Sequence, residues 1–562
     1  MLKNIVVLIF IFQLSMVSWS QMELFNKTYD LGGIGITSAD SYTDIAIKND
    51  TIYLSGSTFG WGNGYRHFSS FGVSTPENIL HHQFMVNTVN SYYSGIGKSL
   101  MIGTEKVILS GSAEGDTLLN NGFTLITNKA GDSLHSIFFP DSAMFQSSIL
   151  SPSEEFIVSA GSKTTNSNID FWIVKYDTIG NIIWQNTFGG SSEDNVFSID
   201  QTHDGGYVMG GYTNSYGSGM RDVYVVKTDS MGVFEWQHIF GDSDNDVGFL
   251  KALDNGDILV YGGTVNIISS ETTSYIRKID SLGNLKWHKE YGYSEDNDDV
   301  IQSMTLSSNG YLFAGFSKDA SDNNPLGWLL KTDFDGNELW SRRFRKRDND
   351  NYFRDVLELP NGDIMACGFV FSEDTLSQDA WLVRTNCLGF DTLPEANGEV
   401  VVLAERKVRL QNMSKAWGNC IIDWGDGTSN YLYEDYATYI EHTYPNTSQR
   451  TIKITAIACG VEDTMSFNIV PTTINVTKET LDKFSLYPNP AYETVTLQIP
   501  AFQEGDYSVR FYNNIGKQVQ IDPTPTALGY EINTMRIPSG IYQVVLVHRN
   551  GMRSNKKLVV QH

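Results

Sequence analysis

The chain has 562 residues, of which 41% are hydrophobic and 19% are charged, and it is rich in Gly (50), Phe (30) and Tyr (28). This length exceeds one ordinary hydrophobic core, so several domains, or one large closed repeat array with appendages, are expected. Abundant glycine and aromatic residues suit many short strands joined by tight turns, which predicts an all-β protein. The formal net charge of -25 repels phosphate backbones and argues against nucleic-acid binding.

The N-terminus has the pattern of an export signal. Lys3 precedes an apolar run at residues 5–12, and small residues surround a cleavage point between Ser20 and Gln21. The run is shorter than the roughly 20 apolar residues that span a bilayer, and no later segment is apolar enough to cross one. We therefore expect residues 1–20 to be a signal peptide and the mature chain to have no transmembrane segment.

A motif recurs every 51 to 53 residues between residues 170 and 389. It consists of a basic residue, an Asp or Asn, a Gly, a Trp and an aromatic residue. The basic residues are Lys175, Lys227, Lys278, Lys331 and Arg384, the glycines are Gly180, Gly232, Gly283, Gly336 and Gly389, and the tryptophans are Trp184, Trp236, Trp287 and Trp340. Such a period indicates stacked copies of one unit. Because the Trp residues recur in phase, we expect them to pack between neighbouring units.

Each unit also contains an alternating strand that ends in Gly. Seven such strands end at Gly56, Gly111, Gly161, Gly211, Gly263, Gly315 and Gly368. With four strands in each clear unit, this pattern predicts a seven-bladed β-propeller at residues 21–390, in which ring closure protects the sheet edges. The last unit lacks a Trp strand, and residues 25–29 match residues 184–188. We therefore expect the N-terminal strand to complete the seventh blade.

The repeats resemble the short β-propeller repeats of exported bacterial proteins. The resemblance is carried by residues 173–184, by the Phe-Gly-Gly at 188–190 and by Asp194, and it is strong over residues 170–390 and weak over 30–160. It implies a fold more than an activity, because propellers host many unrelated functions.

Acidic turns precede the clear blades. Asp194, Asp244, Asp298 and Asp350 each stand 12 residues before a glycine, at 206, 256, 310 and 362, which predicts equivalent positions in an arc on one face. One interpretation is that each carboxylate caps its turn by accepting backbone N–H bonds. The alternative is that these residues, with Asp246, coordinate Ca²⁺. No stretch matches the calcium-loop motif, so calcium is a candidate and no cofactor is assigned.

The sequence assigns no catalytic residue. It contains no G-x-S-x-G elbow and no H-E-x-x-H helix, and the abundance of acids makes any choice of a hydrolytic pair arbitrary. His81 and His82 are adjacent and point to opposite faces of a strand, which disfavours joint metal binding. Trp61 and Tyr65, in a Gly-rich loop of the first blade, are candidate ligand-binding residues for stacking on sugar rings. A loop without a ligand is the alternative.

After a linker at residues 391–397, strand-like alternation resumes at residues 398–471. A W-G-D-G turn at 424–427 is followed by H-T-Y at 442–444. These two motifs, in this order, resemble PKD-type immunoglobulin-like domains, which implies a β-sandwich that spaces or presents other modules. His442 lacks catalytic partners and is expected to be structural.

The four cysteines permit disulfides in an exported chain. Cys420 and Cys459 lie in two predicted strands of the immunoglobulin-like domain and are the favoured pair. Cys367 and Cys387 are the less favoured pair. No Cys/His spacing matches a zinc site.

A second linker at residues 472–481 precedes a last domain at 482–562. Its motif residues, in order, are Tyr487, Pro488, Asn489, Pro490, Gly516, Gly540 and Tyr542, followed by a basic end. The series closely resembles the type A sorting domain of type IX secretion system cargo, found in Bacteroidetes-type bacteria. The resemblance implies a small β-sandwich, export by the Sec and type IX machineries, and removal of the domain with release or attachment to surface lipopolysaccharide.

These features together predict a secreted or cell-surface protein that binds or adheres without catalysis, with a glycan or protein ligand on its propeller face. Two alternatives stay open: a carbohydrate-active or other hydrolytic enzyme using that face, and a scaffold without its own ligand. An enzyme predicts a deep pocket with two close carboxylates or a metal. A binding protein predicts a shallow aromatic or acidic face, and a scaffold predicts neither.

Overall fold

The structure is a computed structural model. It describes residues 24–562 except 30–40, 49–50, 60–65, 74–92, 115–119, 130–132, 140–142, 166–167, 219, 267–271, 293–297, 319–323, 347–349, 372–377, 404–405, 434–438, 472–480, 501, 503–504 and 550. The chain forms two compact units, Met1–Thr392 and Leu393–His562. No helix in the described part is both long and apolar enough to cross a membrane.

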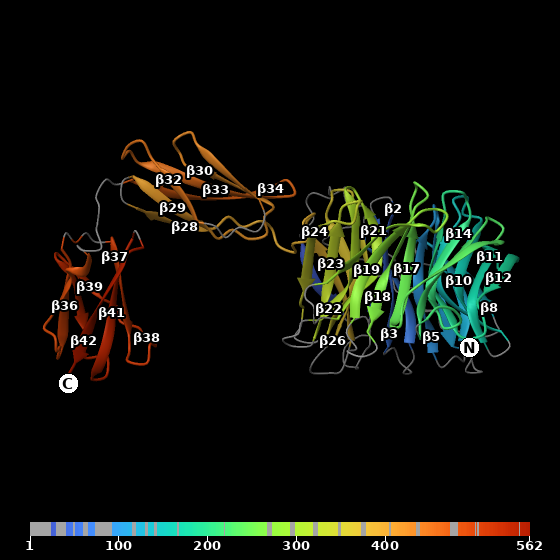
Figure 1. The fold of residues 1–562 in the computed structure, drawn as a ribbon, viewed down its shortest axis with the longest axis horizontal. Helices are drawn as coiled ribbons and strands as arrows, with labels where there is room; N and C mark the ends of the chain where they lie inside the picture. Colours follow the sequence, from blue (N-terminus) through green and yellow to red (C-terminus); the bar gives the residue numbers. More distant parts are fainter. Residues whose placement is uncertain are drawn as a thin grey trace, which may run out of the picture. The chain divides into compact units, whose positions relative to one another are not determined.

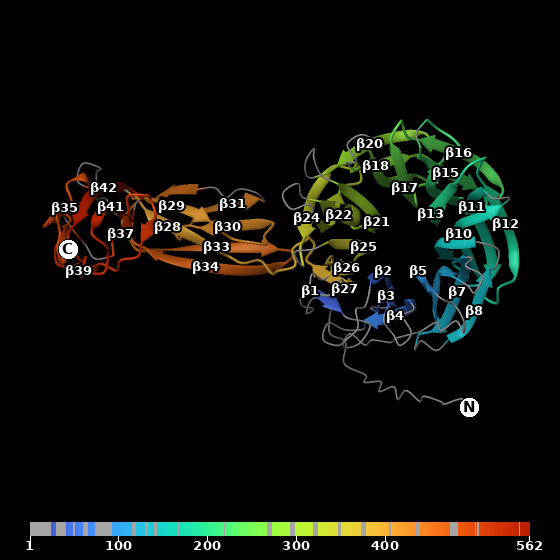
Figure 2. The same cartoon turned by 90° about the horizontal axis from the view of Figure 1, so that it is seen from below.

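The first unit consists of seven antiparallel sheets around a common axis, which confirms the predicted all-β propeller fold (Figure 2). Blade 1 contains β2 (Ser41–Lys48), β3 (Thr51–Phe59) and β4 (Arg66–Val73), and blade 2 contains β5 (Tyr93–Ile102), β6 (Lys106–Glu114), β7 (Asn120–Asn128) and β8 (Ser133–Phe139). Blade 3 contains β9 (Ala143–Leu150), β10 (Phe156–Thr165), β11 (Asn168–Asp177) and β12 (Ile182–Phe188), and blade 4 contains β13 (Asp194–Gln201), β14 (Tyr207–Thr213), β15 (Asp222–Thr228) and β16 (Phe234–Phe240). Blade 5 contains β17 (Asn245–Ala252), β18 (Ile258–Val265), β19 (Thr272–Ile279) and β20 (Leu285–Tyr291), and blade 6 contains β21 (Asp299–Ser307), β22 (Gly310–Lys318), β23 (Pro325–Thr332) and β24 (Glu338–Phe344).

Blade 7 is built from both ends of the unit. It contains β25 (Asn351–Glu358), β26 (Ile364–Phe371), β27 (Gln378–Thr385) and the N-terminal β1 (Phe25–Tyr29), in the order β25-β26-β27-β1. In the antiparallel register, Phe25 lies opposite Arg384 and Tyr29 opposite Ala380. Asn26 accepts a 2.7 Å hydrogen bond from the indole Nε1 of Trp381. Residues 355 positions apart in the chain thus close the ring.

The glycines of the second strands permit a close approach of the innermost strand. A Cβ atom on Gly211 would lie 1.9 Å from the carbonyl oxygen of Asn195, and one on Gly315 would lie 1.8 Å from that of Val300. The corresponding glycine of blade 5 is Gly262, because its Cβ would meet the Val247 oxygen at 2.0 Å. The expected Gly263 is therefore wrong by one residue. Only Gly fits where the backbones meet so closely.

The repeated Trp residues pack between blades, as predicted. Gly232 has a left-handed φ of +75°, and a Cβ on it would lie 2.5 Å from the ring of Trp184 in the preceding blade. The same relation joins Gly336 to Trp287, at 2.8 Å. In these units a Trp ring lies under the turn of the following blade, whereas at Gly283 the ring beneath the turn is that of His238.

The second unit contains two β-sandwiches (Figure 1). The first packs β28 (Gly398–Val402), β29 (Lys407–Asn412) and β32 (Tyr439–Thr443) on β31 (Ser429–Tyr433), β30 (Asn419–Asp423), β33 (Arg450–Ala458) and β34 (Val461–Ile469). The second packs β35 (Ser485–Tyr487), β36 (Thr494–Gln498), β40 (Gly529–Asn533) and β39 (Thr524–Thr526) on β38 (Gln518–Val519), β37 (Tyr507–Tyr512), β41 (Gly540–His548) and β42 (Arg553–Val560).

The two motifs of the first sandwich meet in its core. The rings of Trp424 and His442 stack at 4.8 Å, and His442 Nε2 lies 2.7 Å from Asp426 Oδ2. The Tyr444 hydroxyl donates to the carbonyl of Trp424 at 2.8 Å. These contacts give His442 a structural role.

The favoured disulfide between Cys420 and Cys459 is wrong. Cys420 is a free, buried thiol on β30, and burial raises its pKa to about 11. Cys459 lies at the exposed turn after β33, with φ of +52°. The two residues are separated because one side chain faces the core and the other caps a hairpin. Cys367 is also a free, buried thiol, so it has no bridge to Cys387.

Candidate functional site

The propeller has two faces with different connections. We call the turn face the end that carries the connections between the first and second and between the third and fourth strands of each blade. The loop face carries the connections between second and third strands and between successive blades. Trp61 and Tyr65 fall in the β3–β4 connection, and they lie outside the described residues, as do His81, His82, Ser20 and Gln21. The propeller site is therefore built from the remaining loop-face residues and the innermost strands.

The innermost strands carry β-bulges. In six of the seven described innermost strands one residue is extra relative to the second strand, and these residues are Thr43, Lys98, Gln146, Phe197, Gln302 and Arg354. Phe197 stacks on Phe249 of the next blade at 5.3 Å, and Arg354 donates to Gln302 Oε1 at 2.7 Å. Bulges re-aim side chains and are enriched near functional sites. Here they bring side chains of neighbouring innermost strands into contact around the axis.

The polar residue after a bulge bonds to the next blade. Leu250 N donates to Ser198 Oγ at 2.8 Å, Leu100 N to Asp44 Oδ2 at 2.7 Å, and Ile45 N to Asp355 Oδ2 at 2.8 Å. We call these three acceptors the inter-blade clamps. No sequence motif singles them out, although each stands 12 or 13 residues before the glycine of its second strand, at 211, 56 and 368.

Two of the clamps, Asp44 and Asp355, form a carboxyl pair where blade 7 meets blade 1. Asp44 keeps some accessible surface, but protein surrounds it. Burial, followed by the charge of Asp355 and the hydrogen bond between the two carboxyls, raises the pKa of Asp44 well above its usual range. Ser303 of blade 6 hydrogen-bonds to the other oxygen of Asp355. Two adjacent carboxyls, of which one has a raised pKa, are a combination that can serve acid–base chemistry. The oxygens of these two carboxyls also accept hydrogen bonds from backbone N–H groups of neighbouring blades.

The predicted arc of equivalent aspartates is wrong in part. The strand register places Asp194 opposite Thr213, Asp246 opposite Thr264 and Asp299 opposite Ser317. Asp246 and Asp299, rather than Asp244 and Asp298, are therefore the equivalents of Asp194, and Asn351 rather than Asp350 begins β25. Turns of unequal length and the bulges shift the count by one or two residues, which a fixed spacing does not register.

The acids themselves make turn and side-chain contacts. Asp194 Oδ2 accepts bonds from Gly190 N and Ser215 Oγ, each at 2.8 Å. Asp298 accepts from Thr272 N at 2.9 Å and from Lys318 at 2.8 Å, Asp350 accepts from the Tyr352 hydroxyl at 3.1 Å, and Asp244 accepts from Asn266 at 3.1 Å. Within the described ranges no three His, Cys, Asp or Glu side chains gather as a metal site. We assign these residues to no ion.

A polar and aromatic group lies at the loop-face end of blade 4, which we call the Tyr212 cluster. The Tyr212 hydroxyl donates to Glu193 Oε1 at 2.7 Å and accepts from Asn195 at 2.8 Å. Burial, followed by the hydrogen bond to Glu193, raises the pKa of Tyr212 to about 12. The exposed guanidinium of Arg221 lies 4.4 Å from the Tyr212 ring. This arrangement offers a cation and an acid beside one aromatic ring.

Blade 7 presents a second such group, the Tyr352 cluster. Tyr352 donates to Asp350, and its ring lies 4.8 Å from Phe316 of blade 6 and 5.0 Å from Phe369. Arg354 lies 5.1 Å from the Phe369 ring. The two clusters thus share one composition, an acid, a tyrosine and an arginine, in blades that are not neighbours.

The turn face has a cavity of about 520 Å³, lined by Ile47, Leu306, Ser308, Glu358, Pro360 and Asn361. Glu358 is its acidic group. Its oxygens accept from Ser308 N at 3.1 Å and Ser308 Oγ at 2.8 Å, and Lys331 lies 3.8 Å away. The carboxylate is therefore already engaged by protein groups.

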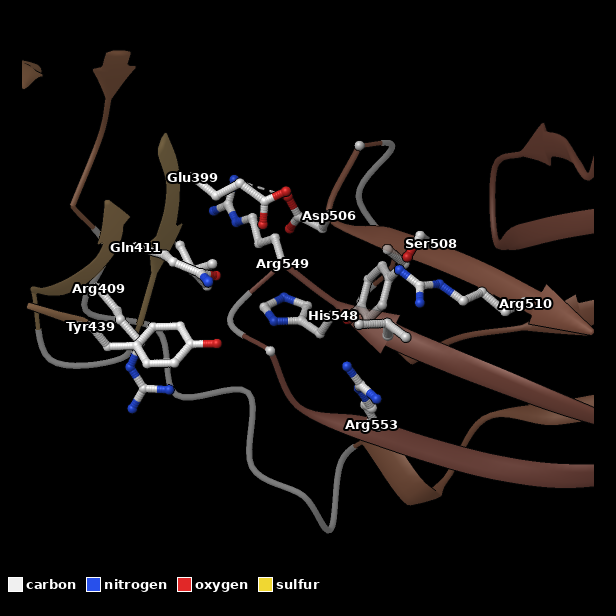
Figure 3. Close-up of a pocket in the computed structure, with 15 residues that line it drawn as sticks. Glu399, Arg409, Gln411, Tyr439, Asp506, Ser508, Arg510, His548, Arg549 and Arg553 are labelled. Carbon is white, nitrogen blue, oxygen red and sulfur yellow. Dashed lines mark ion pairs between the residues drawn. The ribbon is translucent and has the colours of Figure 1, made fainter. Parts of the chain in front are cut away.

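Figure 3 shows two sets of polar residues, one set from each of the two small sandwiches. In the last sandwich, Arg549 pairs with Asp506 at 3.0 Å and His548 packs against Tyr507 at 4.9 Å (Figure 3). In the preceding sandwich, Arg409 donates to Glu441 at 2.9 Å. These pairs occupy strand surfaces and form no catalytic constellation.

The Y-P-N-P motif fastens the last strand of the chain. Both of its prolines follow cis peptide bonds. Asn489 donates to Lys557 O at 2.8 Å and accepts from Val559 N at 2.9 Å, and Ala491 N donates to Val559 O at 2.8 Å. The motif therefore pairs with the outer edge of β42. Gly516 has φ of +80° in a turn, Gly540 begins β41, and the Tyr542 hydroxyl donates to Pro538 O at 2.8 Å.

Comparison with protein families agrees with this part of the chain. Residues 485–561 match the model described as a secretion system C-terminal sorting domain. No curated protein matches the chain. The molecule is therefore an all-β propeller protein that carries a type IX sorting domain. Such a domain indicates export through the type IX secretion system, to the cell surface or into the medium.

Solved structures similar to the chain include the acylaminoacyl peptidase of Pyrococcus horikoshii, at 9% identity and a TM-score of 0.36 over 66% of this chain and 57% of the peptidase. The β-propeller domain of the trilobed protease from Pyrococcus furiosus aligns at 10% identity and 0.37, over 64% of this chain and all of that one (100%). The phage phi92 endosialidase aligns at 9% and 0.38, over 95% and 87%. The chain thus spans little more than half of the first peptidase. At such scores these likenesses carry no argument about activity.

Proposed function

We propose that this chain is a secreted or cell-surface binding or adhesion protein without catalytic activity, whose loop face holds a glycan or protein ligand. The observation that carries the proposal is the asymmetry of that face. The residue after the second-strand glycine is aromatic in blades 4, 6 and 7 and small in the others: Tyr212, Phe316 and Phe369 against Ser57, Ser112, Ser162 and Gly263. Tyr212 packs on Phe197, and Phe316 and Phe369 pack on Tyr352, so aromatic groups gather at blades 4, 6 and 7. A ligand that binds this uneven face would do so in one orientation.

The side chains beside these aromatic residues suit recognition. Each of the Tyr212 and Tyr352 clusters joins an acid and an arginine to an aromatic group. Tyr212 and Phe369 are themselves buried, so Arg221, which is exposed, is the group that a ligand would meet first. Aromatic and arginine side chains carry much of the binding energy at protein surfaces, and aromatic rings also stack on sugars. Trp61 and Tyr65 belong to a loop-face connection and are proposed to extend this surface.

A hydrolytic enzyme is the second candidate, and the Asp44–Asp355 pair is the observation that favours it. Two close carboxyls, one of them with a raised pKa, resemble the acid and base of a glycosidase. Against this role, each carboxyl already accepts a backbone N–H of a neighbouring blade. A catalytic carboxylate needs free lone pairs toward the substrate, so we propose that the pair is a ring clamp.

The sorting domain indicates that the propeller is exported. We propose that residues 398–471 form a PKD-type spacer and that residues 482–562 are removed after export, with release or attachment to lipopolysaccharide. The Trp424–His442–Tyr444 core supports the first proposal, and the sorting-domain match supports the second.

The test uses the exported chain on a glycan array, in capture of surface proteins and in a polysaccharide-degradation screen. Retention of a ligand without its degradation is the expected result. Arg221→Ala should weaken this retention, whereas Lys286→Ala, on the turn face, should not. Degradation that disappears in Asp44→Asn would establish the enzyme instead, and neither retention nor degradation would leave a scaffold.

A further inference from the structure

We propose that the outer face of the sheet β35-β36-β40-β39 is the surface by which the sorting domain docks on a protein of the export machinery. This inference rests on the sorting role and adds where the domain is recognised. The face is marked by three large exposed side chains, Tyr487, Tyr492 and Met535, which are 78%, 60% and 60% exposed. Exposed apolar groups gathered on one surface of a soluble domain indicate an interaction site.

The strand pattern defines this face. In β36, Val495 and Leu497 point into the core, and Thr494 and Thr496 point outward. Tyr487 lies opposite Thr496 in the register, and Thr494 lies opposite Asn533. Because directly opposed residues share a face of a sheet, Tyr487 stands on the outer side, beside Thr496.

Tyr492 and Met535 continue the same face beyond the ends of β36 and β40. Thr534 N donates to Glu493 O at 2.9 Å, and the Thr534 hydroxyl donates to Tyr492 O at 3.1 Å. Met535 N donates to Asn533 Oδ1 at 3.0 Å. These bonds hold the two chain segments together, so Tyr492 and Met535 are presented side by side from ordered backbone.

Tyr487 is the first residue of the Y-P-N-P turn, and Tyr492 follows the turn. Asn489 of the turn is hydrogen-bonded to β42. An anchored turn presents its aromatic neighbours in one conformation, and less entropy is then lost when a partner binds. The core of a protein interface is rich in aromatic residues and methionine and depleted of charge. On the outward positions of β36 and β40, Glu531 is the one charged residue among Thr494, Thr496, Gln498 and Asn533.

The charge distribution decides between a protein and an anionic lipid as the partner. A lipopolysaccharide phosphate requires several cations. One exposed arginine, Arg536, follows Met535, whereas the exposed Arg510 and Arg553 lie on β37 and β42 of the other sheet. The tyrosine-bearing face offers ring surface, a thioether and hydroxyl groups instead. A protein with an apolar receiving surface therefore fits it better than a lipid headgroup does.

The experiment compares two double variants of the full chain in a host with a type IX secretion system. Tyr492→Ser with Met535→Ser removes two side chains of the face and leaves the Y-P-N-P motif intact. The matched control, Ile515→Ser with Ile541→Ser, removes two that are 79% and 48% exposed on the other sheet, in the β37–β38 turn and on β41. Immunoblots measure the fraction of the chain outside the outer membrane against the fraction in the periplasm, and thermal unfolding checks the sandwich.

We expect the face variant to lose export by about tenfold, which corresponds to about 1.4 kcal/mol of docking, while the control stays at the wild-type level. Wild-type export of the face variant overturns the proposal, as does equal loss in both variants with folding unchanged. Loss of export in Arg510→Ala with Arg553→Ala, and not in the face variant, would point to an anionic partner and also overturns it. Export of a chain that ends at residue 480 would instead refute the sorting role itself.

Discussion

The turn face and the loop face of the propeller are built from the same repeats but use them differently. On the turn face, the repeated basic residue pairs with an acid. Lys227 pairs with Asp204 at 2.8 Å and Arg384 with Asp363 at 2.5 Å in their own blades, and Lys331 lies 3.8 Å from Glu358 of the next blade. On the loop face, equivalent positions hold tyrosine, phenylalanine, serine or glycine. Repetition thus marks residues that hold the ring together, whereas the loop-face positions vary from blade to blade.

The turns of the two faces show the same contrast. Asp280 and Asp333 each follow the repeated basic strand, and each accepts backbone bonds from the residues two and four positions later. The side-chain hydrogen bond from Asn337, then the backbone bonds, lower the pKa of Asp333. Loop-face acids such as Asp298 and Asp350 differ from one another in their partners.

The largest effect is expected from Arg384→Met on the turn face. Arg384 is fully buried, and its removal leaves the Asp363 carboxylate without its cation. Breaking a buried pair costs about 3–5 kcal/mol, so the propeller transition in thermal unfolding should fall well below that of the wild type. Replacing both partners, with Arg384→Met and Asp363→Leu, should restore most of the loss. Lys251→Met removes a half-exposed pair with Asp200 and should cost about 1 kcal/mol or less.

A smaller loss is expected from Gly336→Ala. An alanine at this position must adopt the left-handed backbone conformation, which costs about 1–2 kcal/mol. Its Cβ must also displace the Trp287 ring, which lies 2.8 Å away. Gly205→Ala is the matched control, because Gly205 has φ of +85° and nothing lies within 4 Å of its Cβ position. The difference between their unfolding temperatures isolates the inter-blade packing. Equal losses would show that the Trp residues do not hold the turn face.

A pH-dependent effect separates the carboxyl clamp from the turn-face pairs. Because the folded pKa of Asp44 is raised, its stabilising contribution is complete below the ordinary Asp pKa and is lost as the pH rises toward the raised value. Asp44→Asn keeps a neutral donor, so we expect it to gain stability relative to the wild type in that window, by at most about 1.4 kcal/mol per pH unit. Unfolding temperatures measured from pH 4 to 9 test this.

Asp204→Asn supplies the control of opposite sign. Partial burial opposes ionisation of Asp204, but hydrogen bonds from Lys227 and Thr202 outweigh it and lower its pKa to about 2. The wild-type contribution of this group is present above the ordinary Asp pKa and is lost as the pH falls toward 2. The variant should therefore be less stable than the wild type at neutral pH and approach it in acid. The same pH trend in both variants would contradict the assignment of Asp44 as the proton carrier.

The smallest effect on stability is expected from Arg221→Ala on the loop face. An exposed cation over an aromatic ring contributes about 0.5–1 kcal/mol, so the unfolding temperature should hardly move. Ligand retention should fall, since the exposed guanidinium is proposed to contact the ligand. A lower unfolding temperature with unchanged ligand retention would show that Arg221 serves stability, as the turn-face residues do, and not binding.

Much of the fold was predictable from the sequence because its signals are local. The 51-to-53-residue period, the Gly-ended strands and the Y-P-N-P series lie within single hairpins or turns, and each requires a specific residue at a specific backbone position. The match of residues 25–29 to a missing fourth strand also relied on this repetition. β1 pairs with β27 in the structure.

The site was less predictable. A fixed spacing selected Asp244, Asp298 and Asp350, whereas bulges and unequal turns made Asp246, Asp299 and Asn351 the equivalents of Asp194. The disulfide failed for a related reason, because strand membership does not say which way a cysteine faces. The Tyr212 cluster joins Glu193, Asn195 and Arg221 across two loop-face connections, and no single motif contains it.

The sequence by itself determined the repeating unit, the number of blades and the sorting domain, because each depends on short-range backbone requirements that recur or form a known motif series. Only the tertiary structure decided which polar residues join the blades and which carboxyls lie side by side. Asp44 and Asp355 are 311 residues apart in the chain, and they meet only because ring closure brings blade 7 against blade 1. Burial at that junction, which no local pattern encodes, then raises the pKa of Asp44.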